Sequence, residues 1–307
     1  FSENRPPLLT QGRGLCHLRT AVDGKPAAKN RLKRQKIAAP RYCRQWGVSV
    51  IPLRPRSQMN TQRLLVGIDD TDNLDSPGSG TLAAQLAKAL ESAGLGHCDD
   101  ISRHQLFVDE RIPYTSHNSA MCFGLHDHGG DSLPLVSFCQ DFLRTHSAPG
   151  SDPGLCVAAD DGRHGSSLVL FGQQAKARVL SKGDAYLLAR ESDIHLSEHG
   201  GSGGGVIGAL AAVGLRLSGN DGRFRNWLTL GDAGTTLTPL QLRRHQAIDL
   251  VCDKDGQVLA DDEEIRLGED ELKIVLRHGR RVLPVKRCDD GGRPAWQTLS
   301  RREMKGY

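Results

Sequence analysis

The stretch Leu64-Leu-Val-Gly-Ile-Asp-Asp-Thr-Asp72 is the part of the chain from which the fold is best predicted. Its apolar first half, from about Arg63 to Ile68, predicts a short buried β-strand. The strand runs directly into three acidic residues, Asp69, Asp70 and Asp72. Because side chains alternate along an extended backbone, Asp70 and Asp72 are expected on one side and Asp69 on the other.

Three carboxylates in one short turn repel one another, and a bound divalent cation is one way to relieve that repulsion. Mg²⁺ takes one or two protein carboxylates together with substrate phosphates and several waters. The other interpretation is an acidic, solvated turn that caps the following helix. The turn by itself favours neither interpretation, so the choice depends on the segments around it.

The segment after the turn, Ser76-Pro-Gly-Ser-Gly-Thr81, places small residues immediately before a predicted helix. Backbone N–H groups of Gly78, Ser79 and Gly80 suit a phosphate group there, because the N-terminus of a helix attracts anions. Thr81 is either the N-cap of that helix or a ligand of phosphate or metal. No Gly-Lys-Ser or Gly-Lys-Thr follows, so the segment is not a Walker P-loop.

A second glycine-rich loop, residues 200–205, precedes an apolar run. Gly203, Gly204 and Gly205 are therefore candidates for holding a second anion. A flexible linker in front of a buried helix explains the loop equally well, and the spacing of Gly204, Gly205 and Gly208 also permits close helix packing.

Between the two glycine loops, the polar stretch Ile112–Ala120 comes just before a predicted strand. Its residues Tyr114, His117 and Asn118 suit a nucleotide base or a ribose. The alternative is an ordinary polar loop.

The rest of the chain alternates strand and helix patterns. Strands are expected at about 119–125 and 155–159, and helices at 81–90, 133–146, 167–180, 184–191 and 206–213. Residues 248–299 alternate short Val, Ile and Leu runs with turns, which predicts mostly strands. Such alternation fits an α/β or α+β protein, and the turn Pro149–Gly154 is a candidate domain boundary.

Charge is distributed unevenly along the 307 residues. Residues 1–58 hold 13 Lys or Arg and 2 acidic residues, whereas the chain from Met59 onward holds 27 basic and 34 acidic residues, a net charge of −7. Nucleic-acid-binding surfaces cluster Lys and Arg, so the overall charge gives no support to a large one on this acidic core. Residues 1–58 lack any helical or strand period and are expected to be unfolded, either as a basic tail or as a non-native upstream segment.

No apolar run approaches the roughly 20 residues of a membrane-spanning helix, and the first residues lack the apolar core of a secretory signal. We therefore expect a cytoplasmic protein without a membrane partner. The eight cysteines stand singly, with no Cys-x-x-Cys pair to indicate a zinc ribbon.

Taken in order, the Gly67–Asp72 motif, the glycine turn that ends in Thr81, the Ile112–Ala120 stretch and the helix of residues 203–214 resemble the TiaS (tRNA-Ile agmatinylcytidine synthetase) family. The resemblance covers about residues 64–217. It implies a kinase-like domain that binds ATP and Mg²⁺, followed by a ferredoxin-like domain. In that family the wobble cytidine of tRNA-Ile is activated by phosphorylation and then conjugated with agmatine, while ATP ends as AMP and pyrophosphate.

The resemblance also implies roles for individual residues. Asp69, Asp70 and Asp72 would bind metal and ATP, and Thr81 would lie near phosphate or accept a phosphoryl group. Three further residues would lie near the nucleotide or the second substrate, namely Asn118, Gly204 and Gly205. Where the family continues into a zinc ribbon, this tail holds only Cys252 and Cys288, too few for such a ribbon.

The expected fold is α+β, with a kinase-like domain at residues 59–150, a ferredoxin-like domain at residues 151–230 and a strand-rich region at residues 231–307. The expected function is ATP- and Mg²⁺-dependent phosphoryl transfer of the TiaS type, with tRNA as acceptor and agmatine as second substrate. One alternative is a small-molecule kinase or ligase with the same ATP site. Another is a nucleotide- or RNA-binding protein without catalysis.

Overall fold

The computed structural model describes residues 63–306, except for residues 116, 164, 270 and 289–293. The expectations about residues 1–58 therefore fall outside the described residues. Strand β1 (Leu64–Asp69) pairs antiparallel with β4 (Ser119–His126) on one side and with β5 (Gly154–Ala159) on the other. The strands predicted at these three places are confirmed.

Three shorter strands extend this part of the sheet. Strand β6 (His195–Glu198) pairs with β5, while β3 (Ser102–Gln105) and β2 (His97–Cys98) both pair with β4. Strands β5 and β6 come after residue 150, where the sequence predicts a domain boundary. The chain on both sides of that boundary thus contributes strands to the same sheet.

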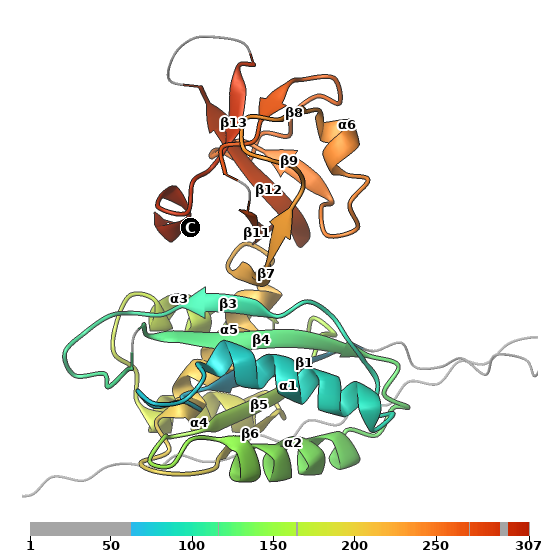
Figure 1. Ribbon diagram of the computed structural model, residues 1–307. Helices are drawn as coiled ribbons and strands as arrows, with labels where there is room; N and C mark the ends of the chain where they lie inside the picture. Colours follow the sequence, from blue (N-terminus) through green and yellow to red (C-terminus); the bar gives the residue numbers. More distant parts are fainter. Residues whose placement is uncertain (1–62, 116, 164, 270, 289–293, 307) are drawn as a thin grey trace, which may run out of the picture. The chain divides into compact units, whose positions relative to one another are not determined.

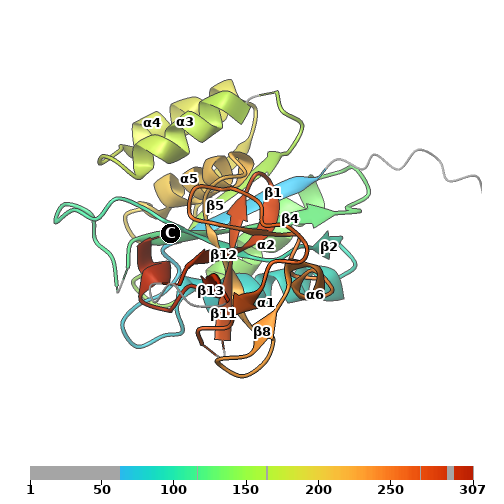
Figure 2. The same ribbon diagram turned by 90° about the horizontal axis from the view of Figure 1, so that it is seen from above.

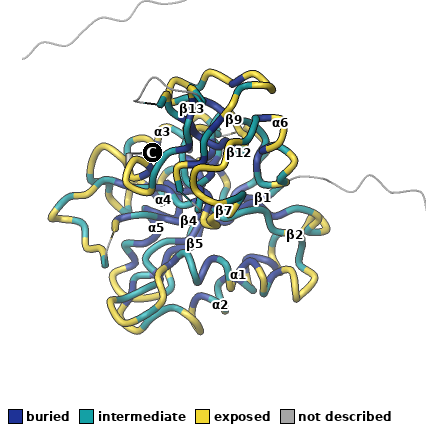
Figure 3. Tube along the Cα trace, turned by 45° about the horizontal axis from the view of Figure 1, so that its top comes forward, coloured by how far each residue is buried: buried dark blue, intermediate teal, exposed yellow. Residues whose placement is uncertain are grey.

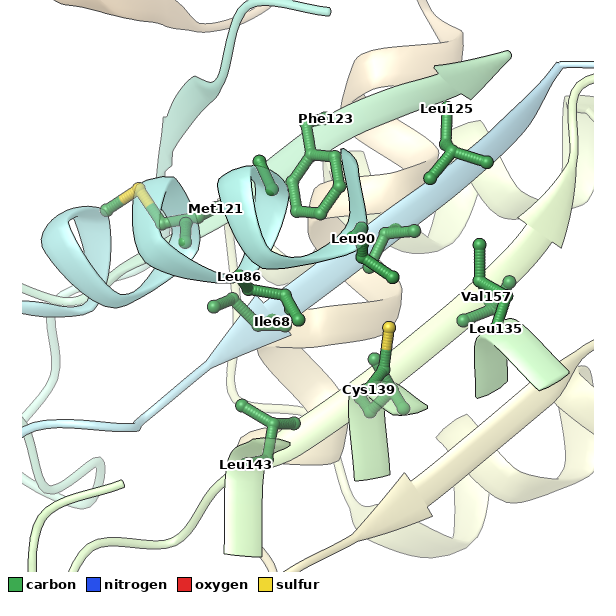
Figure 4. Close-up of a cluster of buried hydrophobic side chains, with 14 of the residues drawn as sticks. Ile68, Leu86, Leu90, Met121, Phe123, Leu125, Leu135, Cys139, Leu143 and Val157 are labelled. Atoms are coloured by element: carbon green, nitrogen blue, oxygen red, sulfur yellow. The ribbon is translucent and has the colours of Figure 1, made fainter. Parts of the chain in front are cut away.

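Helices cover both faces of these strands (Figure 1). On one face, the apolar residues Leu64, Val66 and Ile68 of β1 join a core with helices α1 (Ser79–Ser92) and α2 (Leu133–His146). Figure 4 shows the side chains of Leu86 and Leu90 meeting Ile68, and Cys139 and Leu143 of α2 completing the cluster.

The opposite face of β1 contributes Leu65 to a second core. Its helices are α3 (Gly165–Ala175), α4 (Lys182–Glu191) and α5 (Gly205–Leu217). Helix α5 contacts helices α3 and α4 and strands β1, β4 and β5 (Figures 1 and 2). A helix enclosed in this way must be apolar on all sides, and α5 is the predicted apolar run from Val206 onward.

The sheet continues from β3 into the C-terminal region, where β7 (Arg223–Thr229) pairs with both β3 and β11 (Glu271–Arg277). The order then runs through β12 (Arg280–Arg287), β13 (Trp296–Thr298), β10 (Ile265–Arg266) and β8 (Thr236–Leu237), while β9 (Leu250–Cys252) pairs parallel with β12. Helix α6 (Pro239–Leu242) and the 3₁₀-helix η1 (Glu303–Gly306) complete the region. The strand-rich tail is confirmed.

Burial follows this arrangement: Figure 3 shows the strands mainly as buried or intermediate and the loops around them largely as exposed. The mixture of helices and a largely antiparallel sheet confirms the α+β class. The longest helices described, α1 and α2, have 14 residues each, and none in the described part of the chain is long and apolar enough to cross a membrane.

Several helix boundaries differ from expectation. Helix α1 begins at Ser79, so Thr81 lies inside its first turn and is not its N-cap, which is Gly78. The helix expected to run to Leu180 ends at Ala175, whose carbonyl accepts a hydrogen bond from the Phe107 N–H at 2.9 Å.

Candidate functional site

The three predicted acidic residues lie at the end of β1 and line one cavity of about 200 Å³. The expected division of their side chains between two sides is wrong. Asp70 has a φ angle of 52°, in the left-handed region, so the extended alternation stops immediately after Asp69. Aspartate is one of the few residues that adopt this conformation readily. The turn therefore directs Asp69, Asp70 and Asp72 to the same cavity.

Helix α5 approaches the strand closely at this point because glycines face each other. A Cβ atom at Gly67 would overlap the Ala209 carbonyl oxygen, and one at Gly208 would overlap the Asp69 carboxylate. A Cβ atom at Gly205 would overlap the Asp152 carbonyl oxygen. Close packing thus accounts for Gly205 at the end of the second loop and for Gly208 within α5, and it holds the Asp69 carboxylate against the first turn of α5.

The loop glycines also border the cavity. Helix α5 begins at Gly205 with Gly204 as its N-cap, and both residues line the cavity. Gly203 is not among the lining residues; it has a φ angle of 74° in the turn before the helix. Close packing and cavity lining thus coincide at Gly205, whereas a Cβ atom at Gly204 would make only ordinary contacts.

Asp72 is tied to the start of helix α1. Its Oδ1 atom accepts the Ser79 backbone N–H at 3.1 Å and also accepts the Ser79 hydroxyl, and its Oδ2 atom accepts the Thr115 hydroxyl at 3.0 Å. Ser79 is buried and receives two further bonds from Thr71, from the backbone N–H at 3.2 Å and from the hydroxyl at 3.0 Å. This carboxylate therefore fixes α1 relative to the acidic turn.

A fourth carboxylate, Asp152, lines the same cavity and was missed by the sequence reasoning, which treated residues 149–154 as a boundary. The register of β1 and β5 places Asp69 opposite Gly154, which brings the turn before β5 beside the acidic turn. The Asp152 carboxylate accepts the backbone N–H and the hydroxyl of Ser202. Its own backbone N–H donates to the Asp70 carboxylate. An acidic residue in a glycine- and proline-rich turn just before a predicted strand was the available signal.

Two of the four carboxylates, Asp69 and Asp70, have raised pKa values. Burial, followed by the negative charge of Asp70, raises the pKa of Asp69 to about 8. Burial, followed by the charges of Asp152 and Asp72, raises the pKa of Asp70 to about 6. Crowded carboxylates of this kind bind a proton or a cation in order to be stable.

The described residues do not form a complete protein-only metal cage. Within the described part of the chain, no group of three or more His, Cys, Asp or Glu side chains lies in an arrangement able to hold a metal ion by itself. Mg²⁺ requires less, because one or two carboxylates and the phosphates of a ligand commonly complete its shell. The donor set of this cavity fits that second pattern.

Other residues that line the cavity come from the loop after β3 and from the segment after α3. They include Tyr114, His117 and Asn118 together with the cations Arg111 and Arg178. The Asn118 side-chain amide donates to the Phe107 carbonyl at 2.6 Å, so this largely buried residue supports the loop from within. The residues predicted to bind a base or a ribose thus line the same cavity as the acidic turn.

Ser79 also lines the cavity, whereas Gly78, Gly80 and Thr81 do not. The Thr81 hydroxyl oxygen accepts a hydrogen bond at 3.4 Å from the Arg225 guanidinium, which belongs to β7.

The fold and the site define an α+β protein whose cavity is bordered by four carboxylates and by the N-termini of two helices. No family model matches the chain. An uncharacterized protein of Methanocaldococcus jannaschii is 27% identical over 157 residues, which is 50% of this chain and 50% of that protein.

Solved structures of TiaS are also similar to part of the chain. Its complex with an isoleucine tRNA, AMPCPP and agmatine is 27% identical, with a TM-score of 0.43, over 50% of this chain and 36% of that one. Its complex with the same tRNA and ATP is 26% identical, with a TM-score of 0.45, over 54% of this chain and 37% of that one. The chain thus spans half the length of the curated relative and little more than a third of the TiaS chains.

Proposed function

We propose that this protein is an ATP- and Mg²⁺-dependent phosphoryl-transfer enzyme of the TiaS type that acts on tRNA. The observation that carries the proposal is the convergence of four carboxylates and two helix N-termini on one cavity. The carboxylates are Asp69, Asp70, Asp72 and Asp152, and the helix N-termini are at Ser79 and Gly205.

Different groups in the cavity would bind the metal ion and the phosphates. Asp70 would hold Mg²⁺ with Asp152 as the second carboxylate, because the charge of Asp152 acts on Asp70. The positive ends of the α1 and α5 dipoles would attract the phosphate groups, while the Ser79 and Gly205 N–H groups themselves donate to Asp72 and Asp152. Phosphoryl transfer requires charge neutralisation and positioning more than a covalent nucleophile, so this set of groups is sufficient.

The other end of the ligand would lie toward the loop of Tyr114 and His117, with Arg111 and Arg178 contributing positive charge. When bound, ATP supplies the phosphoryl group and Mg²⁺ offsets its negative charge. The order of sequence motifs, which resembles that of the TiaS family, supports tRNA as the acceptor and agmatine as the second substrate. It also supports a cytoplasmic location.

The test is ATP turnover by the full chain with Mg²⁺, in the presence and absence of bulk tRNA and agmatine, with ADP and AMP resolved as products. We expect AMP and pyrophosphate only when tRNA and agmatine are both present. Turnover to ADP that ignores tRNA would contradict the acceptor and indicate a small-molecule kinase. ATP binding without turnover under all of these conditions would contradict catalysis.

The matched variants are Asp70→Asn and Asp75→Asn. Asparagine also adopts the left-handed conformation, so Asp70→Asn removes the charge while preserving the φ angle of 52°. Turnover should fall roughly 100-fold, the usual scale for losing one electrostatic group of an active site. Asp75 is exposed on the same turn and does not line the cavity, so its variant should retain wild-type turnover.

A further inference from the structure

A second cavity, of about 410 Å³, lies where β3, β7 and β11 meet η1, and its lining contains no acidic residue. Six of its nine lining residues are cationic, and the other three are Phe224, Trp227 and Met304. We call it the basic pocket; its cationic residues are Arg103, Arg223, Arg225, Lys273, Arg301 and Lys305. This concentration of positive charge stands on a chain that is acidic overall from Met59 onward.

Most of these cations are held by neutral partners. Arg103 Nε donates to the Ser119 hydroxyl at 2.9 Å, and Arg223 Nη1 donates to the Met304 carbonyl at 2.9 Å. Lys273 Nζ donates to two backbone carbonyls of β7, those of Arg225 and Asn226. Backbone and hydroxyl oxygens orient these groups and leave their positive charge uncompensated.

Among the described residues, carboxylates form ion pairs with only one of these six cations, Arg301. Arg301 forms an ion pair with Glu271 and lies 4.0 Å from Glu269. Glu271 and Asp221 attract Lys273 and Arg223, respectively, without forming an ion pair with them within the described residues. The centre of the pocket therefore holds an excess of positive charge.

The cations repel one another as a result. Burial, followed by the charges of Arg223, Arg103 and Arg225, lowers the pKa of Lys273 to about 8. Burial and the charge of Arg223 also lower the pKa of Arg103. A bound anion would relieve both effects, because opposite charge stabilises the protonated forms.

An aromatic ring accompanies the charge. Trp227 is 41% exposed, with Lys273 Nζ 4.4 Å and the Arg301 guanidinium carbon 4.8 Å from its ring centroid. Cations that neutralise phosphates beside an exposed aromatic ring that stacks on bases are the usual combination in single-stranded nucleic-acid sites. A small inorganic anion cannot stack on the ring, whereas a nucleotide base can.

The basic pocket also adjoins the acidic cavity. Arg225 lines the basic pocket and donates to the Thr81 hydroxyl oxygen on the first turn of α1. The same turn begins at Ser79, which lines the acidic cavity. A single-stranded nucleic acid bound at Arg225 would therefore pass close to the start of α1.

We propose that the basic pocket binds the phosphodiester backbone of a single-stranded RNA segment, with a base stacked on Trp227. The pocket itself stands on its own contacts and charges. The further step, that this segment belongs to the substrate whose reacting nucleotide enters the acidic cavity, rests on the proposed function.

The test is fluorescence anisotropy of a labelled single-stranded RNA of roughly 12 nucleotides, the length range of such sites. Binding to the full chain is measured without ATP or Mg²⁺ at several salt concentrations. The variants are Arg225→Gln, which changes an exposed residue, and the double variant Arg225→Gln/Lys273→Gln. The matched double control is Lys88→Gln/Arg244→Gln, which removes two exposed charges outside the pocket.

The double variant should bind RNA at least about tenfold more weakly, and its slope of log affinity against log salt should be less steep by about 1.4, or 0.7 for each lost contact. Trp227→Leu should weaken binding about 5- to 100-fold with little change of slope. The control should behave as wild type. Equal affinity and slope in the pocket variants and wild type would overturn the proposal, as would full displacement of RNA by inorganic phosphate but not by chloride at the same ionic strength.

The two proposals fail separately. Asp70→Asn should retain RNA binding, since its charge change lies outside the basic pocket. RNA binding that depends on the pocket in a protein without ATP turnover would leave this proposal standing and remove the proposed function. ATP turnover with tRNA that is unaffected by the pocket variants would leave the proposed function standing and remove the step that links the pocket to the substrate.

Discussion

The Asp72 side chain caps helix α1 from seven residues upstream, because its Oδ1 atom accepts the Ser79 backbone N–H at 3.1 Å. The N-cap residue itself is a glycine and makes no side-chain cap bond. Asp72 thus performs the task that Ser, Thr, Asp or Asn normally performs at the N-cap. A negative charge at this end of the helix is also favourable to the helix dipole.

Asp72→Ala should therefore lower the free energy of unfolding by about 1–2 kcal/mol, the upper range for losing a cap. Asp72→Asn keeps an acceptor oxygen and should lose less. Urea unfolding of both variants measures the difference. The exposed Asp75→Ala is the control and should unfold at the wild-type urea concentration. Equal stability of Asp72→Ala and Asp75→Ala would show that the cap contributes nothing.

The contact between β1 and α5 gives a second prediction, on packing. A methyl group at Gly67 would overlap the Ala209 carbonyl oxygen and lie close to Val213. Backbone cannot yield as a flexible side chain can, so Gly67→Ala should destabilise the protein by about 1–3 kcal/mol. Gly165→Ala is the matched control, since a Cβ atom there meets nothing within 4 Å.

In helix α3, alanine is the better helix former, so Gly165→Ala should leave stability unchanged or raise it by up to about 1 kcal/mol. Thermal or urea unfolding of the pair tests the prediction. A Gly67→Ala protein as stable as wild type would mean that α5 stands farther from β1 than described.

A buried histidine predicts how stability depends on pH. His104 is fully buried, with Nε2 2.7 Å from the Ser102 hydroxyl oxygen and Nδ1 2.9 Å from Asp221 Oδ1. These three residues have the order of a catalytic triad, but Ser102 is also fully buried and out of reach of a substrate. Burial lowers the pKa of His104, although Asp221 acts in the opposite direction.

Because its folded-state pKa is below the ordinary value of 6.5, His104 binds fewer protons in the folded than in the unfolded chain. Its contribution to stability should be complete above about pH 6.5 and should be lost as the pH falls below that value. Urea unfolding at about pH 7.5 and pH 5.5 covers the window. His104→Gln should reduce this pH dependence without abolishing it, since burial also lowers the pKa values of His195 and His199. An unchanged pH dependence in this variant would refute the assignment to His104, and the exposed His97→Gln is the control.

Most of the fold followed from local patterns. Helix α2 matches its predicted range because its apolar spacing is regular, and β1 stands out as an apolar run before a turn. Strands β3 and β6 were not predicted, because Ser-Arg-His-Gln and His-Leu-Ser-Glu contain too little apolar sequence. Their strand conformation depends on pairing with β4 and β5, which no local window reveals.

The site residues that are close in sequence were predictable, whereas those that the fold brings together were not. Asp69, Asp70 and Asp72 are neighbours in sequence, so their crowding was visible, whereas their common direction depends on the φ angle of Asp70. Asp152 joins them only through the register of β1 and β5. The close approach of Gly205 to Asp152 likewise belongs to tertiary packing.

Asp152 provides the prediction that separates metal binding from loop structure. Its carboxylate accepts two hydrogen bonds from Ser202, and its charge acts on Asp70. Asp152→Asn removes the charge, while Ser202→Ala removes only the hydroxyl partner and leaves the charge in place.

If Asp152 holds Mg²⁺, the Asp152→Asn protein should need roughly 10- to 100-fold more Mg²⁺ for half-maximal ATP turnover. Ser202→Ala should need the wild-type concentration. Mg²⁺ and ATP together should raise the melting temperature of the wild type and of Ser202→Ala, and they should raise that of Asp152→Asn less. This readout does not depend on turnover. If both variants lose stability equally and keep the wild-type Mg²⁺ requirement, Asp152 serves only to anchor the glycine loop.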